Sequence, residues 1–204
     1  MTGQNGIGLW WESLSSIIPG GTLGTALVLA VISCILIPVI GLILDALESG
    51  LYGIGMRILG QKLGYWVILI ITWPGVIMHE FAHALFALVT GARVTRISFL
   101  PEKTERGYIL GCVEYGTRGP FPFPAIQNTL SASAPTVVGL FLSGLIMTCL
   151  DRVPGGTLQG VLIYAALCML CHSSMSKQDL KNYWRGVPVL FLLLFAGFLL
   201  MSRV

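Results

Sequence analysis

His79 and His83 flank Glu80 within a stretch that is otherwise almost entirely apolar. If this stretch is helical, the two histidines lie one turn apart on one face, and their ring nitrogens can bind the same metal ion. Glu80 occupies the next helical position and can reach a water molecule on that metal. Ionisable side chains in an apolar helix cost about 2.5–3.5 kcal/mol each and usually serve a function. The pattern therefore predicts a metal site; hydrogen bonds within a bundle are the plainer alternative.

Two histidines leave a catalytic zinc site short of a ligand, because such sites have three protein ligands and a water molecule. Asp179 is the preferred third ligand, since it is the only carboxylate between the last two apolar segments. A helix cap or a pair with Lys181 would also explain Asp179, and His172 is the alternative ligand. Three further glutamates share a segment with several basic residues and are expected on a solvated surface: Glu102, Glu105 and Glu114.

The elements that must position these residues are apolar helices. The 204-residue chain is 55% hydrophobic and only 10% charged, with a mean hydropathy of +0.84, which excludes an ordinary soluble domain. A membrane span needs roughly 20 apolar residues. We predict an all-α integral membrane protein, a bundle of about five (four to six) transmembrane helices forming one domain over 1–204. The candidate spans are 22–44, 65–89, 130–150, 160–171 and 187–201.

Three shorter segments supplement these spans. Residues 51–63 predict a short helix at the membrane surface. The segment 107–115 favours a small β element between spans two and three, where a strand edge could bind an extended peptide. The candidate substrate contacts are Tyr108, Leu110 and Cys112 on this segment, together with Asn128 as a possible oxyanion donor. Small residues of the third span predict close helix packing: Ser131, Ser133, Gly139, Ser143 and Gly144.

The charges indicate orientation and exclude one class of partner. The net charge is only +3 and no dense basic run occurs, so nucleic acid is not expected as a partner. Five spans would place eight Lys and Arg residues on one side of the membrane and four on the other. Positive residues favour the cytoplasmic side, so the N-terminus and the active-site end are predicted to be cytoplasmic.

Two other functions compete with a metal-dependent enzyme. A membrane transporter or scaffold could use the residues at 79–83 to pass ions. The sequence Cys168-Met169-Leu170-Cys171-His172 also fits the attachment pattern of c-type haem, which would make the chain an electron carrier. Attachment normally occurs on the side opposite to the predicted one, so this alternative ranks last.

The motif His-Glu-Phe-Ala-His at 79–83, followed two spans later by Asp179, resembles the site-2 protease family of intramembrane zinc metalloproteases. The similarity covers a core over about 65–185. It implies zinc held by His79, His83 and Asp179, with Glu80 as general base in the hydrolysis of peptide bonds within or beside the membrane. The aspartate is followed by leucine and not by the family's usual glycine, so the resemblance is to a minimal or divergent member.

Overall fold

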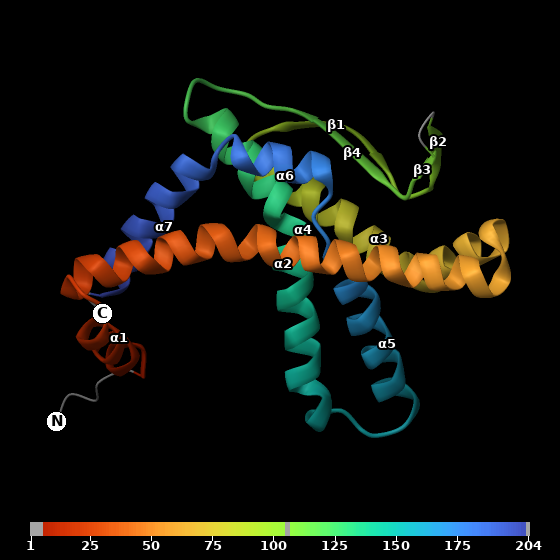
Figure 1. Cartoon of the computed structure of the whole chain (residues 1–204), viewed down its shortest axis with the longest axis horizontal. Helices are drawn as coiled ribbons and strands as arrows, with labels where there is room; N and C mark the ends of the chain where they lie inside the picture. Colours follow the sequence, from red (N-terminus) through yellow and green to blue (C-terminus); the bar gives the residue numbers. More distant parts are fainter. Residues whose placement is uncertain (1–5, 105–106, 203–204) are drawn as a thin grey trace.

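The computed structural model describes residues 6–104 and 107–202, and most of them are helical (Figure 1). The helices are α1 (Gly6–Ile17), α2 (Gly21–Leu59), α3 (Gln61–Val89), α4 (Phe123–Cys149), α5 (Thr157–Cys171), α6 (Lys177–Trp184) and α7 (Val187–Met201), with a 3-10 turn over Leu150–Arg152. By length and composition α2, α3 and α4 can each cross a membrane, and the bent pair α6–α7 is a fourth candidate. α5 has 15 residues, fewer than a span needs. The described part of the chain thus has three or four candidate spans, where the sequence predicted about five.

α2 corrects one sequence prediction. The span at 22–44 and the surface helix at 51–63 are not separate, because one helix of 39 residues, α2, contains the span and continues through the surface segment as far as Leu59. Residues 61–63 begin α3. Gly60 has a φ of 82°, a conformation that glycine adopts without strain and that stops the helix. The two carboxylates between the predicted segments, Asp45 and Glu48, do not end the helix. The side chain of Glu48 turns inward and pairs with His172. A tertiary contact therefore keeps a charged residue inside a continuous helix.

The predicted β element is present and larger than the sequence indicated. β1 (Arg93–Ser98) pairs antiparallel with β4 (Cys112–Gly116), and β2 (Glu102–Thr104) pairs antiparallel with β3 (Gly107–Ile109). These two small sheets form one extended hairpin between α3 and α4, which lies along one side of the helices in Figure 1. The hairpin thus follows directly on the helix that carries the histidine pair.

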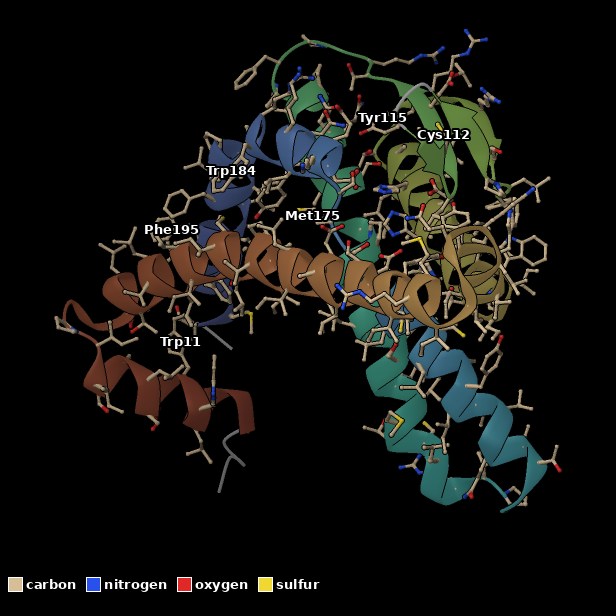
Figure 2. All side chains as sticks on the ribbon, turned by 45° about the vertical axis from the view of Figure 1, so that its right-hand side comes forward. Trp11, Cys112, Tyr115, Met175, Trp184 and Phe195 are labelled. Carbon is tan, nitrogen blue, oxygen red and sulfur yellow. The ribbon has the colours of Figure 1, made fainter. Side chains whose placement is uncertain are left out.

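The helices cross one another and do not run parallel as in a simple bundle. α2 runs across the molecule, whereas α4 and α5 form an antiparallel pair that leaves it at a steep angle (Figures 1 and 2). Small side chains permit the close approach where the helices meet. As predicted for α4, Ser131, Ser133, Gly139 and Ser143 are buried, whereas Gly144 is exposed.

Candidate metal centre

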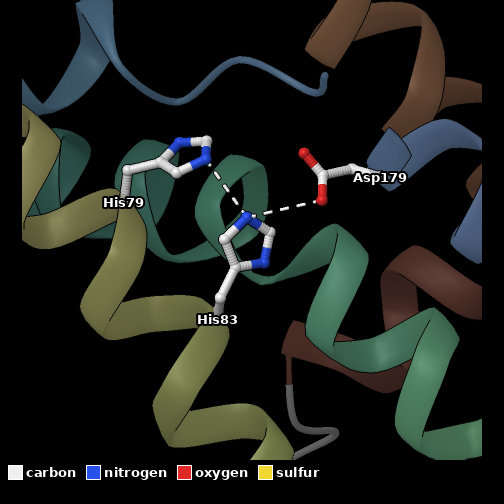
Figure 3. Close-up of side chains that lie close together, drawn as sticks. All are labelled: His79, His83 and Asp179. Carbon is white, nitrogen blue, oxygen red and sulfur yellow. Dashed lines mark hydrogen bonds and ion pairs between the residues drawn. The ribbon is translucent and has the colours of Figure 1, made fainter. Parts of the chain in front are cut away.

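His79 and His83 lie one turn apart on α3, with their rings in contact. Their Nε2 atoms are 3.1 Å apart, and a dashed line joins the two rings in Figure 3. The Nδ1–H of His79 donates to the carbonyl oxygen of His172 at 2.6 Å, and the Nδ1–H of His83 donates to the carbonyl oxygen of Ser131 at 2.8 Å. Carbonyl oxygens only accept hydrogen bonds, so each neutral ring carries its proton on Nδ1 and presents a lone pair at Nε2.

Asp179 brings a third acceptor to the same point. Its Oδ1 lies 3.5 Å from the Nε2 of His83 (Figure 3). Its Oδ2 accepts a hydrogen bond from the backbone N–H of Ser176 at 3.0 Å, while the Ser176 hydroxyl accepts one from the backbone N–H of Asp179, a capping box that begins α6. The helix-cap role and the ligand role, which the sequence left as alternatives, are therefore compatible, because each uses a different carboxylate oxygen.

The donor set fits a divalent cation. One ligand atom from each of His79, His83 and Asp179 lies within 4.8 Å of the other two. Bonds of about 2.0–2.1 Å in tetrahedral geometry separate ligand atoms by roughly 3.3 Å, close to the two distances found here. Three acceptors that face one another without a donor repel each other, and a bound cation removes that repulsion. The hydrogen bonds from each Nδ1–H are the outer contacts that orient histidine ligands in metal sites.

Glu80 lies beside these ligands in the wall of a cavity of about 630 Å³. Its side chain is buried, and a Cβ placed on Gly111 of the hairpin would lie 2.5 Å from its Cγ. No side chain among the described residues donates a hydrogen bond to its carboxylate, which is therefore available to a group inside the cavity. Residues of α2, the hairpin and the segment 172–182 also line the cavity. Its volume suits a segment of peptide or a small ligand.

His172, the alternative third ligand, does not belong to the group that His79, His83 and Asp179 form. Its Nδ1 lies 2.9 Å from a carboxylate oxygen of Glu48, and its contact with the metal ligands is through its backbone carbonyl. The loop glutamates do not join the site either. Glu114 is exposed and pairs with Arg96 at 3.5 Å, in agreement with the solvated surface expected for it. Glu105 and the side chain of Glu102 lie outside the described residues.

The candidate substrate contacts divide into two groups. Leu110 and Cys112 line the cavity from the hairpin, and Figure 2 labels Cys112 on β4. Asn128 is not among the cavity residues, because α4 turns its neighbours Gln127 and Thr129 inward instead. The side chain of Tyr108 lies outside the described part of the structure.

Sequence reasoning missed Glu48 and Tyr115. Glu48 lines the cavity from α2, and the only signal for it was a carboxylate a few residues after the apolar segment 22–44. Tyr115 lines the cavity from β4. Burial raises the pKa of the Tyr115 hydroxyl above its ordinary value, which already keeps the hydroxyl protonated at neutral pH.

Cys168, the first cysteine of the haem-attachment pattern, lies in the contact between α3 and α5. Cys168 is buried, and its thiol lies 3.5 Å from the carbonyl oxygen of Ile71 on α3. The contact is close, because a Cβ on Gly75 of α3 would lie 2.1 Å from the carbonyl oxygen of Cys168. Haem attachment would require α3 and α5 to separate at this point, so the geometry gives no support to that alternative.

Comparisons of the chain with protein-family models, with curated proteins and with solved structures found no match. Any functional assignment therefore depends on the geometry of the site.

Proposed function

We propose that this chain is a zinc-dependent intramembrane endopeptidase similar to the site-2 proteases, a multi-pass protein with its N-terminus and active-site end in the cytoplasm. One observation carries the proposal: the lone pairs of His79 and His83 converge with a carboxylate oxygen of Asp179, and Glu80 faces the same cavity. Zinc held by these three residues would supply a Lewis acid that polarises a peptide carbonyl and makes a nearby water molecule more acidic.

Glu80 moves the proton in this proposal. Its carboxylate accepts a proton from the attacking water molecule and returns it to the amine that leaves when the peptide bond breaks. Its burial in the cavity wall suits this role, since few water molecules compete for the carboxylate there. Gly111 lets the hairpin backbone approach Glu80, because any larger residue would displace the carboxylate.

The hairpin is the proposed binding surface for substrate. β4 pairs with β1 along one edge, and no other described strand pairs with its second edge. The residues from Ile109 to Val113 line the cavity next to Glu80. An extended peptide can add to a free strand edge through backbone hydrogen bonds, which demands no particular side chains. The substrate class is therefore a membrane protein or peptide that is locally unwound beside the bilayer.

The test begins with the metal content of the purified protein in detergent. We expect about one zinc per chain, and a sharp fall in Asp179→Ala, because two histidines alone do not complete the site. Iron in place of zinc would contradict the hydrolytic assignment, since two histidines and one carboxylate also form non-haem iron centres.

Glu80→Gln tests the chemistry. We expect this variant to keep its zinc and to cleave peptides at least about 10²-fold more slowly than wild type. The substrates are single-span peptides reconstituted in liposomes, and mass spectrometry detects their cleavage. Cleavage at the wild-type rate would exclude Glu80 as the base. Ion flux through the same liposomes without peptide cleavage would favour the transporter alternative.

A further inference from the structure

We infer that Glu48 is a positioning residue for the metal ligands, although it lies on α2, outside the core that the sequence indicated. It holds the segment 172–176, which orients His79 and leads into the helix that carries Asp179. The inference rests on the proposed metal site and assigns a function to a charged residue that the hydrolytic mechanism does not use.

Both oxygens of Glu48 have partners in this segment. One carboxylate oxygen lies 2.9 Å from the Nδ1 of His172, and the other accepts a hydrogen bond from the hydroxyl of Ser174 at 2.7 Å. The side chains of Glu48 and His172 are only 12% and 4% exposed. A buried carboxylate with both oxygens satisfied fixes its partners far better than an exposed one does.

Hydrogen bonds connect this segment directly to two of the metal ligands. The ring of His172 is held by Glu48, and the carbonyl oxygen of the same residue accepts the hydrogen bond from the Nδ1–H of His79. A few residues later, Ser176 caps α6 and binds one carboxylate oxygen of Asp179. Two of the three ligands therefore depend on a segment that Glu48 attaches to α2.

The backbone of α2 completes the attachment. The N–H of Met175 donates to the carbonyl oxygen of Gly41 at 3.1 Å. Gly41 allows this contact, because a Cβ at that position would lie 2.6 Å from the Cβ of Met175. α2 thus holds the segment both at Gly41 and, two turns later, at Glu48. Packing alone would need only an apolar residue at position 48, so the carboxylate indicates a requirement for orientation.

The experiment measures metal binding and its geometry in full-length variants. Zinc affinity is determined by competition with a chelator, and the visible absorption of bound Co²⁺ reports the coordination geometry. We expect Glu48→Ala to weaken zinc binding by about 10-fold to 100-fold and to alter the Co²⁺ spectrum. Glu48→Gln keeps an acceptor for His172 and a partner for Ser174, and we expect it to restore affinity to within about threefold of wild type.

Asp45→Ala is the matched control for charge. Asp45 lies one turn earlier on α2 and interacts electrostatically with Glu48 and Asp179. It has no hydrogen bond to the segment 172–176 among the described residues. We expect wild-type zinc affinity and an unaltered Co²⁺ spectrum in this variant. An equal loss of affinity in Asp45→Ala and Glu48→Ala would show a general charge effect and overturn the inference.

The two proposals fail in different ways. Zinc binding by wild type together with unchanged affinity and spectrum in Glu48→Ala overturns the positioning role and leaves the proposed function intact. Absence of metal binding in wild type overturns both. If Glu48→Ala does not fold, as judged by circular dichroism, Ser174→Ala replaces it, since it removes one of the two hydrogen bonds. Affinity within about twofold of wild type in Ser174→Ala would then overturn the inference.

Discussion

The cavity has two walls of opposite character. One wall is the segment 172–179, which is inserted among three helices and touches a glycine on each: Gly41 of α2, Gly75 of α3 and Gly139 of α4. The other wall is the hairpin, whose large apolar side chains remain exposed at Ile97 and Ile109. Its attachment to the helices includes a hydrogen bond from the indole N–H of Trp73 to the carbonyl oxygen of Phe99 at 2.9 Å.

The two walls therefore suit two different functions within one site, metal binding and peptide binding. Buried hydrogen bonds and close backbone contacts favour a single arrangement, which a metal site needs. A wall with exposed strands and a free edge has fewer contacts to break and can adapt to a peptide. We therefore expect changes in the first wall to reduce stability and metal affinity together, and changes in the second to affect catalysis alone.

The largest expected effect is that of Gly75→Ala in the first wall. The new methyl group would lie 2.1 Å from the carbonyl oxygen of Cys168 and 2.6 Å from the ring of His172, so α5 must move away from α3. Such overpacking costs about 1–3 kcal/mol. The shift also carries the His172 carbonyl away from His79, so zinc affinity should fall at least about tenfold.

Thermal unfolding in detergent and chelator competition measure the two effects of Gly75→Ala. Gly144→Ala on α4 is the control, because no atom lies within 4 Å of a Cβ there, and it should be neutral or slightly stabilising. A stable Gly75→Ala variant with wild-type zinc affinity would contradict the tight packing of this wall.

Gly111→Ala tests the second wall and should have an intermediate effect. The methyl group would lie 2.5 Å from the Cγ and 2.8 Å from a carboxylate oxygen of Glu80. The side chain of Glu80 can rotate away, so we expect little loss of stability but about 10-fold to 100-fold slower peptide cleavage. Zinc affinity should remain within about twofold of wild type. Gly116→Ala, in the same hairpin with open space around it, should leave all three properties unchanged.

Glu114→Ala on the outer face of the hairpin should have the smallest effect. Its side chain is 55% exposed and its ion pair with Arg96 spans 3.5 Å. Exposed pairs of this kind contribute about 0–1 kcal/mol, so unfolding temperature, zinc content and cleavage should all stay close to wild type. Loss of zinc in this variant would show that the hairpin supplies a ligand and that the two walls are not distinct.

The local features of the site could be predicted from the sequence. A four-residue spacing on a helix places His79 and His83 on one face whatever surrounds them, and the run of apolar residues predicts a membrane helix around them. The β element after this helix and the small residues of α4 were also recognisable from composition.

Contacts between distant segments could not be predicted in this way. The sequence left Asp179 and His172 as rival ligands. In the structure the carboxylate of Asp179 lies with the two histidines in one group, whereas the Nδ1 of His172 pairs with Glu48. Asn128 was expected at the site, but the rotation of α4 places its neighbours inward.

The sequence by itself determined that His79 and His83 could hold a metal and that they lie in an apolar helix, since both follow from spacing and residue type over a few turns. Only the tertiary structure decided which carboxylate joins the histidines, and that α2 is one continuous helix with Glu48 in the interior. The physical reason is that a contact such as the pair of Glu48 with His172 joins residues far apart in the chain, and sequence spacing carries no information about such a partner.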